Sequence, residues 1–198
     1  MPPKTAIPSA RQRELLEAAH EYVLAHGLAD LSLRPLAEAI GSSTRVLMFL
    51  FGNKDGLVRA LLERARTEEL ALLAHLRRRD RPVGLGAAAE LVWSWLAAEE
   101  HRPLLRLWAE AYARSLVEPN GPWTGFARST VEDWLDVLAA CQAPPDRESE
   151  DGAVLRTLTL AVLRGALLDL LATDDERRVT AAVHRQLALL HQDETSGT

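Results

Sequence analysis

The stretch SLRPLAEAIGSSTRVLMFLFGN, residues 32–53, decides the fold. Ser32 can cap a helix of about two turns, Pro35 suits the first turn of that helix, and Gly41 ends it. Ser43 can cap a second short helix over 44–51, which Gly52 ends. A helix of this length is not stable alone in water, so it must pack against its neighbours. The stretch therefore predicts two short packed helices joined by a tight turn, which is a helix-turn-helix candidate.

Helical patterns continue on both sides of this stretch. The preceding segment, from Ala10, has apolar residues at spacings of three and four and ends at Gly27. Asn53 can cap a long helix that runs to about residue 79. Five more helices are expected from the positions of prolines, glycines and caps. Their approximate ranges are 85–100, 103–117, 123–140, 151–172 and 174–191, between a proline-containing arm (1–9) and a polar tail (192–198).

Composition agrees with an all-α protein of about nine helices. The chain has 36 Leu and 31 Ala but only 12 Val and 2 Ile, and Leu and Ala favour helices whereas β-branched residues favour strands. Hydrophobic residues make up 47% of the 198 residues, which is enough for a packed core. We expect an N-terminal three-helix head over 10–54, with the helix-turn-helix at 32–51, and a second helical domain over 55–192.

Several other classes of protein are disfavoured. The single cysteine, Cys141, rules out a disulfide framework within the chain and a cysteine-rich zinc site. The longest uninterrupted apolar run, 46–51, is far shorter than the roughly 20 residues of a membrane span. The first residues also lack the apolar segment of a secretory signal. A cytoplasmic protein without a membrane partner is expected.

Catalytic and metal-binding patterns are equally sparse. Glu17-x-x-His20 has the spacing of one half of a di-iron site, but the second half is missing, and a solvated helix face is the simpler interpretation. We find no nucleophile elbow, phosphate loop or dinucleotide-binding turn. Cys141 lies beside a proline-rich loop without a motif around it. We therefore expect no enzymatic activity, no catalytic residues, no metal and no cofactor.

Residues 10–62 resemble the TetR family of one-component transcriptional regulators. The resemblance rests on RELLEAA (13–19), HGL (26–28), SLRPLAEAIG (32–41), Leu47 and FGNKDGL (51–57), in the order and spacing of the family. It covers roughly the first third of the chain, and the rest matches only in layout. The resemblance implies a dimer that binds a DNA operator through residues 32–51 and responds to a small molecule held by the C-terminal helices.

The resemblance also implies which side chains meet DNA. Thr44 and Arg45 lie where the family reads base edges, and an arginine can donate two hydrogen bonds to guanine. Lys54 stands where the family places a phosphate-binding lysine. Arg34 and Ser43 can also reach phosphates.

Three neighbouring positions differ from the residues that the family commonly has. Where the family commonly has tyrosine and histidine, this chain has Met48, Phe49 and Leu50, none of which can donate a side-chain hydrogen bond. Two interpretations stay open at this point. Met48 or Phe49 contacts thymine methyls, or the protein binds DNA more weakly and depends on Lys54 and Arg45. The simpler structural alternative is that these residues only fill the core of the domain.

The C-terminal domain is rich in aromatic residues that can line a pocket for a small hydrophobic effector. The candidate pocket residues are Trp93, Trp95, Trp108, Tyr112, Trp123, Phe126 and Trp134. Trp93 and Trp95, two positions apart on a helix, cannot face the same way. Segment 151–172 is apolar almost all round, which indicates burial on two sides, one of them against a second copy of the chain. The candidate dimer residues there and in the last helix are Leu160, Leu163, Gly165, Leu167, Leu187 and Leu190.

The charge distribution completes the functional expectation. Net charge is −5, which argues against a surface that binds phosphate throughout. Residues 1–54, however, hold six basic and five acidic residues, a net of +1, and the acid excess of −6 lies in the rest of the chain. We therefore expect a repressor that binds a palindromic operator through a few cations and is released by an effector. The alternative is a helical small-molecule-binding protein or enzyme that has lost DNA binding.

Overall fold

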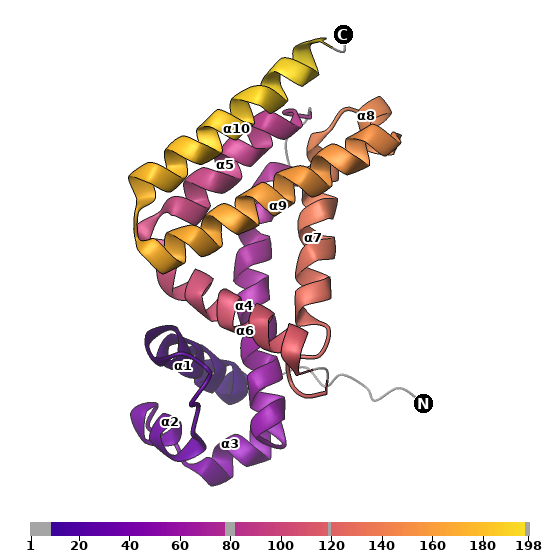
Figure 1. Ribbon diagram of the computed structural model, residues 1–198. Coiled ribbons are helices and arrows are strands. Elements are labelled where there is room, and N and C mark those ends of the chain that lie inside the picture. Colours follow the sequence, from indigo (N-terminus) through magenta and orange to yellow (C-terminus); the bar gives the residue numbers. More distant parts are fainter. Residues whose placement is uncertain (1–8, 78–81, 119, 197–198) are drawn as a thin grey trace.

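The computed structural model describes residues 9–77, 82–118 and 120–196, and every regular element in these ranges is a helix (Figure 1). The all-α prediction is confirmed. The expected N-terminal arm lies, up to residue 8, outside the described residues. The helices are α1 (Ala10–His26), α2 (Leu33–Ala39), α3 (Thr44–Phe51), α4 (Lys54–Arg77), α5 (Leu85–Ala97), a 3₁₀ turn (Glu99–His101), α6 (Arg102–Val117), α7 (Phe126–Cys141), α8 (Pro144–Glu148), α9 (Glu150–Thr173) and α10 (Glu176–Ser196).

The described residues thus contain ten α-helices rather than about nine. The extra one is α8, which we expected to be a proline-punctuated loop. Pro144 and Pro145 occupy the first turn, where a missing N–H and a fixed φ do no harm. Arg147 then donates to the carbonyls of Ala139 (2.8 Å) and Ala140 (3.1 Å) in the last turn of α7. These hydrogen bonds of Arg147 hold the short helix against the end of α7.

Helices α1, α2, α3 and the start of α4 lie together at one end of the molecule (Figure 1), and a first core is buried among them. Leu36 of α2, Leu47 of α3 and Leu61 of α4 are almost completely buried in it. The Gly41 backbone has φ of +62°, which favours glycine, and it lets the Ser42 N–H bond the Ala37 carbonyl at 2.8 Å. This turn sets the direction in which α3 leaves α2.

A second core lies among α5, α6, α7, α9 and α10. The two cores are joined by α4, which packs against α1 and α3 at one end and α7 at the other, and by α6. One face of α6 adds Leu104, Leu107 and Ala111 to the first core, and another adds Leu105 and Trp108 to the second. The first core therefore continues past residue 54 and includes residues of the C-terminal half.

No helix of the described residues has the length and apolar character needed to cross a membrane.

Candidate nucleic-acid interface and buried chamber

Helix α3 is built to present one face outward. The Ser43 hydroxyl accepts a hydrogen bond from the Val46 N–H (3.3 Å) and caps the helix. Leu47 faces inward and is 1% exposed, which anchors the helix to the head. Phe49 faces outward and is 85% exposed, and Met48 beside it is 41% exposed. With Val46, which is 38% exposed, these two side chains form an apolar patch on α3, and such a patch is typical of a contact surface.

All the residues expected to meet DNA lie on the surface: Arg34, Ser43, Thr44, Arg45, Met48, Phe49 and Lys54 are exposed. Among the described residues, no ion pair involves Arg34, Arg45 or Lys54. Their positive charges are therefore available to an external anion.

Two local contacts fix the direction of α3. Gln12 of α1 donates from its side-chain amide to the Leu50 carbonyl at 3.0 Å. After α3, the Asn53 side chain accepts from the Gly56 N–H at 2.7 Å and caps α4. A Cβ at Gly56 would lie 2.0 Å from the Phe51 carbonyl oxygen, so only glycine allows this approach of α4 to α3. Lys54 is thereby held beside the exposed face of α3.

The Glu17–His20 pair braces the head. Glu17 accepts two hydrogen bonds from the guanidinium of Arg64, at 2.8 and 2.9 Å, and this contact lowers the pKa of Glu17. His20 is buried, and burial lowers its pKa. Among the described residues, no group of three or more metal-ligating side chains comes together. The Glu17–Arg64 contact ties α1 to α4.

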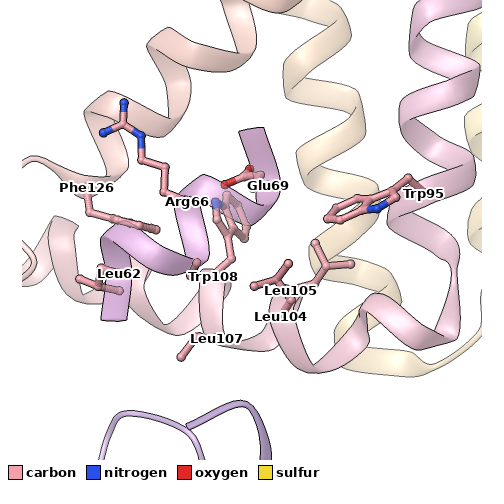
Figure 2. Close-up of a pocket in the computed structure, with 10 residues that line it drawn as sticks. Leu62, Arg66, Glu69, Trp95, Leu104, Leu105, Leu107, Trp108 and Phe126 are labelled. Carbon is pink, nitrogen blue, oxygen red and sulfur yellow. The ribbon is translucent and has the colours of Figure 1, made fainter. Parts of the chain in front are cut away.

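Two small cavities in the second core share a wall, and we call them together the Glu69 chamber. Both are lined by Glu69 of α4 and by Leu105 and Trp108 of α6. Figure 2 shows the first cavity, in which Glu69 lies beside Trp108 while Trp95 approaches from α5 and Phe126 from α7. The second is also lined by Trp134, Leu96, Leu160, Leu163, Arg164 and Leu167. The cavities hold about 10 and 20 Å³, which is room for a water molecule and not for an organic ring.

Glu69 is the notable group of this chamber, and the sequence analysis did not identify it. It accepts a hydrogen bond from the indole N–H of Trp134, and only 9% of its surface is exposed. Burial raises the pKa of Glu69 to about 7, against the lowering effects of the Trp134 hydrogen bond and of Arg66. The available signal was its position on the apolar stripe of this helix, four residues after Ala65 and three before Leu72.

The predicted pocket residues divide between this chamber and other places. Trp95, Trp108, Phe126 and Trp134 line it. Trp93 points away, and its indole N–H donates to Thr180 of α10 at 3.1 Å. Trp123 belongs to the first core, beneath the guanidinium of Arg114. The Tyr112 hydroxyl accepts from Arg164 (3.1 Å) behind the chamber wall.

The predicted dimer residues are mostly inside the chain. Leu160, Leu163, Leu167 and Leu187 are at most 7% exposed and belong to the second core, whereas Gly165 is on the surface. The side chain of Leu190 lies outside the described residues. Another face of α9 is apolar and exposed. This face, which we call the α9 stripe, consists of Val154, Leu158, Ala161, Gly165 and Leu168. Leu189 of α10 is also exposed.

Comparison with known proteins identifies the type of molecule. Residues 15–61 match the family described as bacterial regulatory proteins, tetR family. The HTH-type transcriptional repressor Rv1474c of Mycobacterium tuberculosis is 27% identical over 183 residues, which are 88% of this chain and 90% of that protein. The HTH-type transcriptional regulator BetI 1 of Chromohalobacter salexigens is 26% identical over 123 residues, 60% of this chain, and the chain spans 59% of its length.

A solved structure extends the match to most of the chain. The multidrug binding protein EbrR, complexed with proflavin, has a TM-score of 0.60 and 27% identity, over 88% of this chain and 98% of that one. A helix-turn-helix head with an exposed reading helix, joined to a helical domain with a buried chamber, defines a DNA-binding transcriptional regulator. Residues 15–61 thus match the TetR family of regulatory proteins, and most of the chain is similar to Rv1474c and to EbrR.

Proposed function

We propose that this protein is a one-component repressor that binds a palindromic operator as a homodimer and leaves it when a small hydrophobic effector enters the Glu69 chamber. The observation that carries the proposal is the outward face of α3, where Arg45 and the exposed Phe49 stand beside the unpaired Lys54. We assign DNA binding to residues 10–54 and effector binding and dimerisation to residues 55–192.

Each exposed side chain has a role in this proposal. Arg45, with Thr44 beside it, reads base edges in the major groove, where arginine pairs with guanine O6 and N7. Lys54, Arg34 and Ser43 bind phosphates and position the head. Phe49 and Met48 contact thymine methyls, which gives their exposed apolar surface a partner. Such a regulator works in the cytoplasm, where bacterial DNA lies.

Helix α6 provides a route from the chamber to the head. Leu105 and Trp108 on this helix line both cavities, so a ligand larger than these small cavities must displace them. Glu110, on the same helix, accepts a hydrogen bond from the Leu28 N–H at the end of the first helix of the head, at 2.9 Å. Displacing α6 therefore moves the head, and a changed spacing between two heads prevents both from entering successive major grooves.

The relatives support this reading of the chamber and of the head. Rv1474c is named a transcriptional repressor, and EbrR has been solved with imidazole, with proflavin and with ethidium. A protein of the same fold thus holds small organic molecules.

The test is a gel-shift selection from random duplex DNA, followed by binding to the selected sequence and to scrambled DNA. We expect a two-fold symmetric site with salt-dependent affinity. Arg45→Ala should lose about 1–3 kcal/mol of discrimination between the two DNAs, whereas Lys54→Ala should weaken both alike. Arg128→Ala, which removes an 82% exposed arginine on α7, is the matched control.

Two results would contradict the proposal. One is unchanged binding in both head variants. The other is an absence of selective binding by the full-length protein, which would favour a small-molecule-binding protein that has lost DNA binding.

A further inference from the structure

We infer that the Glu69 chamber takes a carboxylate with a short apolar tail, whose oxygens accept hydrogen bonds from Arg164, Trp108 and the carboxyl group of Glu69. The last of these bonds requires a proton on Glu69, so the anion and a proton bind together. This inference rests on the proposed function, because it names the class of effector for the same chamber.

Two hydrogen-bond donors at the second cavity lack an acceptor among the described residues. They belong to Arg164 of α9 and Trp108 of α6, which both line this cavity. The Nη2 atom of Arg164 and the indole Nε1 of Trp108 are buried, and neither has a hydrogen-bond partner. A buried donor without an acceptor is unfavourable, and a carboxylate offers two acceptor oxygens. A ligand with such a group therefore satisfies both donors.

The charge balance of the chamber also favours an anion. Arg66 of α4 pairs with Asp133 of α7 at 2.6 Å, and Glu69 takes up a proton because burial raises its pKa to about 7. The guanidinium of Arg164 donates to the Tyr112 hydroxyl at 3.1 Å, but among the described residues no ion pair involves Arg164. The positive charge of Arg164 is thus left without a counter-ion, and a carboxylate supplies one.

Glu69 completes the binding site as a donor. One of its oxygens accepts from the indole N–H of Trp134, which leaves the other oxygen to carry the proton. Glu69 lies beside Trp108 (Figure 2) and lines the same cavity as Arg164. A protonated carboxyl donates a hydrogen bond to a carboxylate, whereas an ionised one repels it. The anion therefore binds only when Glu69 holds its proton.

The walls of the second cavity suit a short apolar tail. Apart from the polar groups and the two indoles, the lining consists of leucines: Leu96, Leu105, Leu160, Leu163 and Leu167. The cavity holds about 20 Å³, so an organic ligand must open it. Leucine side chains make room by changing rotamer, and a tail of a few carbons needs the smallest displacement. The carboxylate then lies at the polar end, and the tail lies among the leucines.

The experiment measures binding of three probes with a six-carbon chain to the full-length protein without DNA, by calorimetry and by ligand-detected NMR. Hexanoate is the anion, hexanamide is its uncharged counterpart of the same shape, and hexylammonium carries the opposite charge. At pH 6 we expect wild-type protein to bind hexanoate about tenfold or more tightly than hexanamide. Hexylammonium should bind most weakly, because its charge repels Arg164.

The pH dependence tests the coupled proton. Hexanoate affinity should fall about tenfold between pH 6 and pH 8, because at pH 8 Glu69 must first take up a proton. The other charged groups around Glu69 are the Arg66–Asp133 pair and Arg164, and these do not titrate in this range. In the described lining, α5 and α6 contribute no titratable group. Hexanamide affinity should therefore change little with pH.

Two variants separate the charge of the chamber from its fold. Arg164→Gln should lose about tenfold or more in hexanoate affinity while hexanamide affinity changes little, which also shows that the chamber remains folded. In Glu69→Gln the amide accepts from Trp134 and donates to the anion at every pH, so hexanoate should bind equally at pH 6 and pH 8. The control Arg128→Gln removes an 82% exposed arginine of α7 and should bind all three probes as wild type does.

Failure of hexanoate to bind, equal binding of hexanoate and hexanamide, tighter binding of hexylammonium, or full hexanoate affinity in Arg164→Gln would each overturn the inference. So would a wild-type pH dependence that persists in Glu69→Gln, and this variant decides the matter if Arg164→Gln loses both probes. Because no DNA is present, these outcomes are independent of the operator experiment. Hexanoate bound through Arg164 in a protein without selective DNA binding would keep this inference and refute the repressor.

Discussion

Glu69 ties the stability of the molecule to pH. Its pKa of about 7 in the folded protein lies above the ordinary value of 4.5, so the folded state holds the proton more tightly than the unfolded chain. The stabilisation by that proton is complete below about pH 4.5 and is lost as pH rises through 7. At pH 8 the buried carboxylate therefore destabilises the fold by up to about 3 kcal/mol.

Glu69→Gln should remove this dependence. The stability of the variant minus that of wild type should rise by about 2–3 kcal/mol between pH 5 and pH 8, measured by urea unfolding at both values. The difference between pH values is the informative quantity, because the buried amide carries its own hydrogen-bonding penalty at every pH. The control Glu68→Gln should show no such rise, and a flat profile for Glu69→Gln would contradict the raised pKa.

The residue scale also shows the limits of sequence reasoning. Arg45 and Leu47 could be placed on opposite faces of α3 from the helical period alone. The helix has only eight residues between Gly41 and Gly52, so it can bury a single face. Glu69 could not be found in this way, because an acid on a helix is exposed far more often than buried. Its burial depends on the crossing of α4 with α6 and α7, which no local pattern records.

At the scale of elements, the junction of α3 and α4 is the most constrained part of the head. The absent side chain of Gly56 lets the first turn of α4 pass the Phe51 carbonyl, and Asn53 caps the same turn. A Cβ at 2.0 Å from a carbonyl oxygen forces the backbone apart. The junction sets the position of Lys54 relative to α3. Strain at this junction should therefore lower both the stability of the protein and its affinity for DNA.

Gly56→Ala should therefore destabilise the protein by about 1–3 kcal/mol although alanine favours helices. Thermal and urea unfolding measure this loss. The control Asp55→Ala changes an exposed first-turn residue and should lose less than about 1 kcal/mol. A Gly56→Ala protein as stable as wild type would show that the junction relaxes freely.

Helix α9 shows why the sequence alone could not tell which face of a helix packs against the chain's own core. It is apolar nearly all round, so the period identifies two buried sides without saying which one belongs to the chain's own core. The structure decides: Leu160, Leu163 and Leu167 face α5 and α7, and the α9 stripe faces outward. Arg178 of α10 bonds both carboxylate oxygens of Asp169 (2.8 and 2.9 Å), which fixes α10 against α9 in this orientation.

At the scale of the whole molecule, the two cores are distinct but not separable. α4 runs from the head, where Leu57 and Leu61 are buried, to Glu69 in the chamber, and α6 contributes to both cores. Composition and caps predicted the helices and their order, yet they could not show that the head is completed by residues from beyond position 100. Such contacts depend on tertiary packing, and they connect the head to the chamber.

The α9 stripe carries the prediction for the assembled protein. Val154, Leu158 and Leu168 are 46–60% exposed along one face. Gly165 lies between them, and a Cβ built there would meet no other helix of the described residues within 4 Å. A two-fold pairing of these stripes buries them and sets two heads side by side for a symmetric site. Leu158→Glu combined with Leu168→Glu should then convert a dimer into a monomer, because burying four carboxylates against apolar surface is strongly unfavourable.

Sedimentation equilibrium with the wild type and the double variant measures this directly. Leu116→Glu, which places a charge at a 66% exposed leucine on α6 away from the stripe, should stay dimeric. The monomeric variant should also lose most of its affinity for the full operator while keeping its helical content, because each head alone contacts one half-site. A double variant that remains dimeric would place the interface on another face of the molecule.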